Sequence, residues 1–407
     1  ELSAIIGNGY AVMYVSSKMV VEKSLKDGYL VGSRGSVGSS FVATMAGITE
    51  VNPLPPHYIC GKCKYLEWGD IEKYDCGVDM PDKTCPLCGT VLNRQGFSIP
   101  FETFLGFGGE KEPDIDINFA GEYQLTAHKY IEELFGKGNV FKAGTIGTIQ
   151  DRIAYGYVKT YQEEEGEGVS KWEVERLVQG CSGIKRTTGQ HPGGIIIVPE
   201  GHNIHEFCPV QHPANDSNSE VVTTHFDYHS IDKNLLKLDL LGHDVPSQIR
   251  HLQDMTGVDP LSFSMSDPAV LKIFRGTESL NIKERKYRFT HGTYGIPEFG
   301  TEFVRRMLDD TMPENFADLV RISGFSHGTD VWNNNARELI KQGIATMRDA
   351  ISTRDDIMNY LIMKGLPKED AFSIMERVRK GRGVTLSEEE ALKKKGVKEW
   401  YIESLKK

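Results

Sequence analysis

The chain has 407 residues, of which 39% are hydrophobic and 26% are charged. This composition is ordinary for a globular protein of roughly two to four domains and excludes a largely disordered chain. Its longest apolar runs fall well short of the ~20 residues that a membrane-spanning helix requires, so we expect no transmembrane segment and no membrane partner. The formal net charge of −10 argues against a simple cationic DNA-wrapping protein, because phosphate binding draws on lysine and arginine.

The start of the chain and its cysteines indicate its origin and compartment. The first residue is Glu1, and the residues that follow lack the basic region, apolar core and cleavage site of a secretory signal. We therefore interpret the sequence as a piece of a longer protein. Four of the seven cysteines form two C-x-x-C pairs, which in a chain without a secretion signal favour metal binding over disulfides. A reducing cytoplasm fits this pattern best.

A glycine- and serine-rich stretch is the first notable segment. Residues 29–31 are predicted as a short strand, residues 32–40 as a loop and residues 41–46 as a helix. Glycines let backbone amides approach an anion, serines add hydroxyl donors, and the start of a helix is positive. The segment lacks the Gly-Lys-Ser/Thr ending of a P-loop. It is therefore predicted to hold phosphates, with a tight turn as the competing interpretation.

A cysteine-bearing insert follows at residues 52–97. Its two C-x-x-C pairs have the spacing of a four-cysteine zinc ribbon, and a closed shell of four thiolates predicts structural rather than catalytic zinc. Redox pairs or a degenerate site are the competing interpretations. Cys76 lies between the pairs as a spare or as a replacement for one ligand, and Cys181 and Cys208 read as core cysteines. The predicted zinc ligands are Cys60, Cys63, Cys85 and Cys88.

Two acid-bearing segments predict a centre for divalent cations. Residues 113–119 alternate as a half-buried strand, with Asp114 and Asp116 on the same face. Asp239 is the sole acid in an apolar run at residues 235–241, where an uncompensated charge is unfavourable unless it is paired or bound to a metal. We therefore expect the three carboxylates to bind two magnesium ions, with manganese as a substitute, for nucleotidyl transfer. The competing interpretation is an Asp-x-Asp loop that binds nothing.

The segment at residues 185–194 combines cations, hydroxyls, an imidazole and glycines just before an apolar strand at 193–198. We expect it to be a loop that contacts DNA phosphates, whereas a turn with solvated cations is the competing interpretation. The predicted DNA-binding residues are Lys185, Arg186, Thr188 and His191.

The last part of the chain is predicted to be mainly helical, with strong segments near residues 336–342, 351–363 and 371–379. Helical spacing is also found at 127–135, whereas the Glu- and Gly-rich stretch 162–175 is expected to be exposed. A polar cluster at residues 321–332 is predicted to face an incoming nucleotide through Arg321, His327 and Thr329. Helix capping by Ser326 or Thr329 is the competing interpretation. Basic clusters at 377–382 and 393–395 are candidates for local phosphate contacts or for solvated helix faces.

Four segments together carry a resemblance to a known family. They read Gly-Ser-Arg-Gly-Ser-Val-Gly-Ser-Ser from Gly32, Pro-Asp-Ile-Asp-Ile-Asn from Pro113, Lys-Arg-Thr-Thr-Gly-Gln-His-Pro-Gly-Gly from Lys185, and Leu-Leu-Lys-Leu-Asp-Leu-Leu-Gly-His-Asp from Leu235. This set resembles the C-family DNA polymerases. The four-cysteine insert is similar to that of the PolC type of DNA polymerase III alpha subunit, the replicative enzyme of low-GC Gram-positive bacteria. The resemblance covers nearly the whole chain.

The resemblance implies an α+β fold with a polymerase-beta-like nucleotidyltransferase palm, a zinc-ribbon insert, a helical thumb and mainly helical fingers. The palm would occupy residues 1–145 and 185–242, with the zinc-binding insert at 52–97. The thumb would occupy 146–184 and the incomplete fingers 243–407. It also implies that the catalytic carboxylates are Asp114, Asp116 and Asp239, and that the triphosphate is held by Gly32, Ser33, Arg34, Gly35 and Ser36.

The predicted function is template-directed transfer of deoxynucleotides to a primer 3′-hydroxyl in chromosome replication, although the isolated piece is not assured of activity. Primer–template DNA and deoxynucleoside triphosphates are the expected partners. The sliding clamp and clamp loader are expected to bind through parts of the full-length protein that this chain does not include. The sequence at 280–291 departs from the family pattern. The alternatives are a template-independent nucleotidyltransferase and a non-catalytic, zinc-bearing DNA-binding module.

Overall fold

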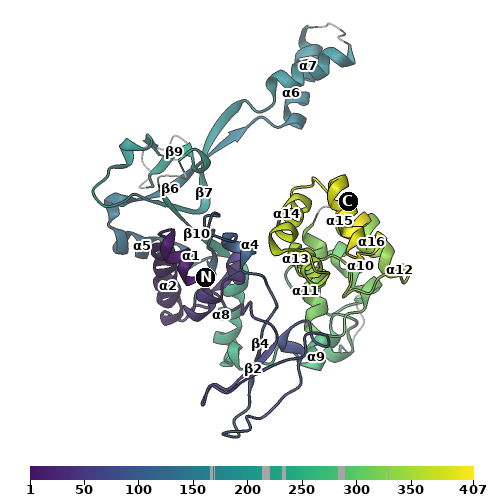
Figure 1. The fold of residues 1–407 in the computed structure, drawn as a ribbon. Helices are drawn as coiled ribbons and strands as arrows, with labels where there is room; N and C mark the ends of the chain where they lie inside the picture. Colours follow the sequence, from purple (N-terminus) through teal and green to yellow (C-terminus); the bar gives the residue numbers. More distant parts are fainter. Residues whose placement is uncertain (166–167, 169, 213–220, 232–234, 283–288, 329) are drawn as a thin grey trace. The chain divides into compact units, whose positions relative to one another are not determined.

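The computed structural model describes residues 1–407 except 166–167, 169, 213–220, 232–234, 283–288 and 329 (Figure 1). The chain divides into two compact units, and each is described by itself. The first unit combines Glu1–Ala11, Ser33–Pro113 and His251–Lys407, and the second combines Val12–Gly32 and Asp114–Arg250. Among the described residues, we find no helix with both the length and the apolar character needed to cross a bilayer.

A mixed β-sheet is the centre of the second unit, with strand order β5-β10-β7-β6-β9-β8. β10 runs parallel to β5 and antiparallel to β7, while β6 pairs antiparallel with β7 and parallel with β9. The strands are β5 (Asp116–Ala120), β6 (Val140–Thr148), β7 (Lys185–Ile197), β8 (Val210–Gln211), β9 (Thr223–Asp227) and β10 (Leu236–His243), and β1 (Gly32–Arg34) straddles the boundary between the units.

Helices accompany this sheet. They are α2 (Ala11–Lys26), α5 (Gln124–Phe135), α6 (Asp151–Glu165), α7 (Lys171–Cys181) and α8 (Asp244–Thr256), with short 3-10 turns at Lys137–Asn139, Ile204–Glu206 and Tyr228–Ser230. α7 begins where the Ser170 hydroxyl accepts the Glu173 amide, a standard N-cap. β6 and β7 run out of the sheet as a two-stranded ladder that ends in α6 and α7 (Figure 1).

The predicted strands of this unit are largely confirmed, with three corrections. The 113–119 strand begins only at Asp116, so Asp114 lies just before it, and the strand expected at 29–31 is displaced to β1. The prediction of a loop at 185–194 is wrong, because residues 185–197 form the single strand β7. Pairing with β6 at residues 195–197 and again at 185–190, on either side of an irregularity in the ladder, overrides the turn tendency of this segment.

The cysteine-bearing insert belongs to the first unit and forms a small antiparallel sheet of order β3-β2-β4. Its elements are β2 (His57–Ile59), β3 (Leu66–Trp68), a 3-10 turn η2 (Gly77–Asp79) and β4 (Asn93–Gln95). Tyr58, Met80 and Leu92 are buried together with Cys60 and Cys85 in a core of its own. With so few apolar side chains, this segment is of the size that usually needs a metal or a disulfide for stability.

The rest of the first unit is mainly helical, as predicted. Its elements are α1 (Leu2–Gly7), η1 (Gly35–Ser39), α3 (Phe41–Met45), α4 (Glu102–Leu105), η7 (Pro260–Ser262), α9 (Pro268–Lys272), η8 (Glu278–Leu280), α10 (Glu302–Thr311), α11 (Phe316–His327), η9 (Trp332–Ala336), α12 (Arg337–Lys341), α13 (Arg354–Met363), α14 (Lys368–Arg379), α15 (Leu386–Lys394) and α16 (Glu399–Lys406). Capping boxes start α13 at Thr353 and α15 at Thr385. One core packs α10 and α11, and another packs α13 to α16.

Candidate catalytic and metal-binding sites

The three predicted acids come together at one end of two neighbouring strands in the second unit. In the parallel pair of β5 and β10, Asp116 lies directly opposite Asp239. Asp114, Asp116 and Asp239 each offer a carboxylate oxygen, and these oxygens lie within 4.8 Å of one another. Asp114 is exposed, Asp116 is half-buried and Asp239 is buried. This part of the sequence prediction, the meeting of the acids, is therefore confirmed.

The acid trio, defined as Asp114, Asp116 and Asp239, carries more negative charge than its neighbouring cations compensate. Burial, followed by repulsion from Asp114 and then Asp239, raises the pKa of Asp116 to about 7. In addition, the buried Oδ1 atom of Asp239 has no hydrogen-bond partner among the described residues. Such an orphaned oxygen is unfavourable in a protein interior, so a bound cation would relieve it.

Among the described residues, the cation in contact with the trio is Lys237, which was not predicted as a site residue. Its Nζ atom lies 2.7 Å from Oδ2 of Asp239, and both side chains are largely buried. The signal was available, because Lys237 and Asp239 are two residues apart on one strand and must project from the same face. Lys237 thus holds one oxygen of Asp239 and leaves the other free for a ligand.

His191 on β7 also lies beside the trio, with Nδ1 3.7 Å from Oδ1 of Asp239. That nitrogen accepts the backbone amide of Gly194 at 2.6 Å, so the ring proton is on Nε2. Burial lowers the pKa of His191, which keeps the ring neutral near pH 7. Gly194 pairs with Asp239 across the ladder, and a Cβ atom there would fall 2.7 Å from the His191 ring. Only glycine permits this close approach.

The donor set of the trio suits magnesium or manganese. Both are hard cations that prefer carboxylate oxygens, and magnesium is commonly held by one or two carboxylates together with water and substrate phosphates. Within the described residues, the trio supplies three carboxylates, one of them with an unpartnered buried oxygen, and Lys237 offsets only part of the charge. The residues therefore fit a site for divalent cations.

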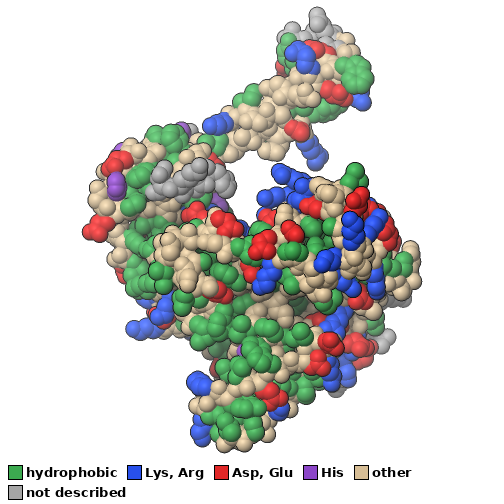
Figure 2. Space-filling model, in the orientation of Figure 1, with side chains coloured by type: hydrophobic (Ala, Val, Ile, Leu, Met, Phe, Trp, Pro, Cys, Tyr) green, Lys and Arg blue, Asp and Glu red, His purple; other side chains and the backbone are tan. Residues whose placement is uncertain are grey.

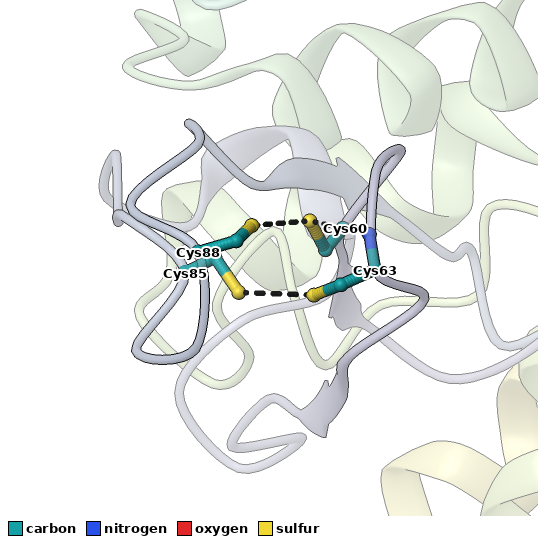
Figure 3. Close-up of side chains that lie close together, drawn as sticks. All are labelled: Cys60, Cys63, Cys85 and Cys88. Atoms are coloured by element: carbon teal, nitrogen blue, oxygen red, sulfur yellow. Dashed lines mark hydrogen bonds between the residues drawn. The ribbon is translucent and has the colours of Figure 1, made fainter.

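The four predicted cysteine ligands converge in the insert, with their sulfur atoms pointing toward one another (Figure 3). Cys60 and Cys88 approach to 3.5 Å between Sγ atoms, and so do Cys63 and Cys85. Tetrahedral zinc with bonds of about 2.3 Å requires sulfur–sulfur separations of about 3.8 Å. The arrangement fits a closed structural zinc site after a shift of a few tenths of an ångström.

Local hydrogen bonds prepare two of these cysteines to act as thiolates. The backbone amide of Cys63 donates to Sγ of Cys60 at 3.4 Å and lowers the pKa of Cys60. The Thr90 hydroxyl, 3.4 Å from Sγ of Cys88, lowers the pKa of Cys88 to about 6. A metal binds the thiolate form, so both contacts favour ligation.

The remaining cysteines lie outside this set. Cys76 is buried and donates its thiol to Asp79 at 3.1 Å, and burial raises its pKa to about 12. It is therefore a spare cysteine rather than a replacement ligand. Cys208 packs in the core of the second unit, as predicted, whereas Cys181 is only partly buried.

The glycine-serine motif divides between the two units. In the second unit, Gly32 lies against Asn118, since a Cβ atom at Gly32 would be 3.9 Å from that of Asn118 on the strand that carries Asp116. In the first unit, the Ser33 hydroxyl bonds to Thr49 at 2.7 Å and to Glu50 at 3.2 Å. Gly35 has φ +67°, which favours glycine. The roles predicted for Arg34 and Ser36 rest on the sequence.

The start of α3, which was expected to attract an anion, already has acceptors. The Ser40 hydroxyl accepts the amide of Ala43, and the Glu1 carboxylate accepts the amides of Phe41 and Val42 at 3.0 and 2.8 Å. A carboxylate at this position satisfies the orphan amides of the first turn, as any anion would.

Among the predicted DNA-binding residues, His191 is the one that lies at the acid trio. Lys185 and Arg186 are exposed at the start of β7, and Arg186 stacks 5.6 Å above the Tyr157 ring on α6. Thr188 is half-buried on the same strand. Their contact with DNA remains a prediction.

The predicted nucleotide contacts in the last part of the chain have different surroundings. Arg321 on α11 is largely buried and faces two carboxylates, Asp75 at 3.4 Å and Asp356 at 3.5 Å. His327, at the end of the same helix, is exposed and lies 3.5 Å from Glu298. Thr329 lies outside the described residues. Arg321 therefore already has partners for its charge within the unit.

A basic cleft of about 490 Å³ lies at the end of α14 in the first unit. Its cations gather on one face of the helical region (Figure 2). Glu376 pairs with two of them, Arg379 at 2.8 Å and Lys380 at 3.7 Å. The charged side chains that line the cleft are Glu110, Lys111, Glu376, Arg377, Arg379, Lys380 and Arg382. Five cations against two carboxylates leave an excess of positive charge, which suits a phosphate-bearing ligand.

Comparison with known protein families gives two matches that together span most of the chain. Residues 1–242 match the bacterial DNA polymerase III alpha NTPase domain. Residues 245–400 match the bacterial DNA polymerase III alpha subunit finger domain. The first match alone covers more than half of the chain. The chain therefore belongs to the bacterial DNA polymerase III alpha family.

Several similar curated proteins are of the PolC type within that family. The chain is 60% identical over its whole length to the DNA polymerase III PolC-type of Caldanaerobacter subterraneus subsp. tengcongensis, of which it covers 29%. It is 58% identical to that of Bacillus subtilis, covering 28%, and 56% identical to that of Thermotoga maritima, covering 30%. The chain thus spans less than a third of the length of these relatives.

Proposed function

We propose that this chain forms the nucleotidyl-transfer part of a bacterial replicative DNA polymerase of the PolC type. In this role it adds deoxynucleotides to a primer 3′-hydroxyl as directed by a template. The observation that carries the proposal is the parallel register of Asp116 with Asp239, which brings carboxylates distant in sequence within reach of one cation. The identity of 56–60% to PolC-type polymerases over the whole chain supports it.

Asp114, Asp116 and Asp239 would hold the catalytic cations, magnesium or, as a substitute, manganese. When bound, such ions lower the pKa of the primer hydroxyl and neutralise the triphosphate and its leaving group. Lys237 orients the Asp239 carboxylate through the 2.7 Å contact and leaves Oδ1 available. The neutral His191 ring lies beside the same carboxylate, and its Nε2–H would donate a hydrogen bond to a phosphate or to the primer terminus.

The fold assignment that accompanies this proposal is a polymerase-beta-like palm at residues 1–145 and 185–242. The helical pair α6 and α7 would be the thumb at 146–184, and residues 243–407 would be the fingers. The four cysteines would hold a structural zinc in a ribbon at 52–97. Mixed strands beside helices and the converging sulfur atoms support these assignments.

Phosphate contacts are proposed for two groups of residues. Gly32 and the loop from Ser33 to Ser36 would cradle the triphosphate, together with His327 and Thr329. Lys185, Arg186 and Thr188 on β7 would contact the DNA backbone. The positive excess of the cleft at the end of α14 supports a further contact with phosphates through Arg382, which has no ion pair among the described residues.

We further propose a cytoplasmic location, with primer–template DNA and deoxynucleoside triphosphates as partners. The sliding clamp and clamp loader would be bound through other parts of the full-length protein. A template-independent nucleotidyltransferase and a non-catalytic zinc-bearing module are not favoured. The match of residues 245–400 to a polymerase finger domain supports template-directed synthesis instead.

Single-turnover incorporation by a full-length enzyme that contains this chain tests the proposal. Asp116→Asn should lower the rate by at least about a hundredfold, because the site acts by positioning and charge neutralisation. Glu133→Gln is the matched control, since it removes one exposed carboxylate from α5 of the same unit and should leave the rate unchanged. An Asp116→Asn enzyme that folds normally and keeps the wild-type rate would refute the assignment.

A further inference from the structure

The insert makes a polar contact with the start of α11. Asp79, at the end of η2, accepts the backbone amides of Phe316 at 2.8 Å and Ala317 at 2.9 Å. These are the first two residues of α11, whose amides have no acceptor within the helix. A carboxylate at this position also interacts favourably with the positive end of the helix. The insert thus supplies the cap for a helix more than two hundred residues further along the chain.

A second contact joins the insert to the middle of α11 through charge. Asp75 lies 2.7 Å from Nε of Arg348 and 3.4 Å from the Arg321 guanidinium. Arg321 in turn reaches Asp356 at the start of α13, at 3.5 Å. Arg348 also donates to the backbone carbonyl of Ile71 at 2.9 Å. The segment around Asp75 is therefore tied directly to Arg321 and Arg348, and through Arg321 to the start of α13.

Apolar packing covers these polar contacts. Cys76 and Val78 of the insert share a buried cluster with Ala317 of α11, and the Phe97 and Phe316 rings pack at its edge with centroids 6.4 Å apart. Burial removes water from the Asp79 cap, which strengthens its hydrogen bonds. The same interface thus combines a helix cap, an ion-pair network and an apolar core.

The contacting residues, Asp75 and Asp79, lie on the chain between the two cysteine pairs. Met80, next to Asp79, packs in the core formed by Cys60 and Cys85. Gly77 lies between the two acids, its amide bonds to Gly96 at 2.8 Å, and a Cβ atom there would collide with the backbone of Gln95 at 1.9 Å. Because this segment lies on the chain between Cys63 and Cys85, a metal bound to the four cysteines would close the loop that contains it and restrict the positions that Asp75 and Asp79 can adopt.

We propose that the segment at residues 70–80 is a metal-dependent clamp, in which Asp75 and Asp79 are positioning residues that hold α11. Metal at the four cysteines orders the segment, and the segment holds the first turn of α11 and Arg321. Arg321 then serves the clamp rather than a nucleotide. The clamp concerns the first unit alone, while its consequence for nucleotide affinity rests on the nucleotide contact proposed for His327 at the end of α11.

Hydrogen exchange on the 407-residue chain tests the clamp directly. Removal of the metal by a chelator should make the amides of residues 316–321 exchange at least about tenfold faster, whereas α15 and α16 in the same unit should not change. Asp79→Ala should give the same local effect while the metal stays bound, and Asp79→Asn, which keeps one acceptor oxygen, should restore part of the protection. Asp82→Ala is the matched control, because its side chain is 83% exposed.

Thermodynamic reciprocity supplies a second, independent measurement. If metal stabilises the contact with α11, loss of the contact must weaken metal binding by the same factor. Competition with a chromophoric zinc chelator should therefore show about tenfold weaker binding for Asp79→Ala and no change for Asp82→Ala. Equal exchange at 316–321 with and without metal, or equal zinc affinity for Asp79→Ala and the unaltered chain, would overturn the clamp.

Steady-state kinetics of the full-length enzyme test whether the clamp also affects deoxynucleotide binding, independently of the exchange and zinc measurements. Asp79→Ala should raise KM for deoxynucleotides several-fold with little change in kcat, and Asp79→Asn should reverse part of the rise. Unchanged KM alongside altered exchange would count against the nucleotide contact proposed for His327 at the end of α11. The exchange and zinc measurements would still decide the clamp.

Discussion

Two clusters of carboxylates, one in each unit, have opposite charge balances. In the second unit, Asp114, Asp116 and Asp239 meet with one lysine, and a buried oxygen of Asp239 has no hydrogen-bond partner among the described residues. In the first unit, Asp75 and Asp356 face two arginines, Arg321 and Arg348. The first cluster is arranged to receive a cation, whereas the second is already compensated. Charge balance, rather than the number of acids, thus distinguishes a candidate binding site from a structural network.

Loss of metal from the cysteines should produce the largest effect and should disrupt the compensated cluster. Structural zinc sites contribute on the order of 10 kcal/mol to the folding of small domains. We expect a zinc chelator to lower the first unfolding transition in calorimetry by more than about 10 °C, whereas removal of magnesium alone leaves it in place. An identical transition with and without chelator would mean that the insert folds without metal.

Arg321→Met should be the most damaging single substitution in the compensated cluster. The change leaves Asp75 and Asp356 with weaker compensation in a largely buried place, which typically costs about 2–4 kcal/mol. Urea denaturation of the first unit measures the loss. Arg306→Met is the control, because its exposed pair with Glu302 should contribute less than about 0.5 kcal/mol. Equal stability of the two variants would remove the distinction between the clusters.

The acid trio should respond to pH in the opposite sense from an ordinary salt bridge. Burial and then repulsion raise the pKa of Asp116 from 3.8 to about 7, so between these values the folded chain keeps a proton that the unfolded chain has released. Without metal, stability should therefore fall as the pH rises from about 4 to 7. Asp116→Asn should remove this slope and raise metal-free stability at pH 8 by roughly 1 kcal/mol, after allowance for solvent screening.

Denaturation at several pH values, with and without magnesium, checks this prediction. Bound magnesium should flatten the slope of the unaltered chain, because the cation compensates the ionised carboxylates. A stability that rises with pH in the absence of metal would show that the trio is compensated, like the cluster around Arg321.

The smallest effect is expected at the exposed cations of β7. Lys185→Ala should weaken DNA binding only a few-fold and reduce the slope of log affinity against log salt by about 1, as for a single phosphate contact. Fluorescence anisotropy over a range of salt concentrations measures both quantities. An unchanged salt slope would show that Lys185 does not contact the DNA. His191 would then be the predicted β7 residue that remains, beside the acid trio.

Much of the local structure was predictable from sequence patterns. The alternation at 113–119 and the apolar run at 235–241 correspond to β5 and β10, and the spacing of the cysteines correctly identified the group that converges. The segment at 185–194 was misread as a loop, because its glycines, threonines and proline favour turns in isolation. Pairing with β6 and β10 decides its conformation, and that pairing depends on residues far away in the sequence.

The sequence by itself determined which side chains are the candidates for metal binding, because the period of a strand and the spacing of C-x-x-C pairs are properties of neighbouring residues. Only the tertiary structure decided their partners. Asp116 meets Asp239 through strand register, Lys237 holds Asp239, and Arg321 faces the insert. Such contacts join segments that local patterns treat as independent, and they form only when packing repays the entropy of closing long loops.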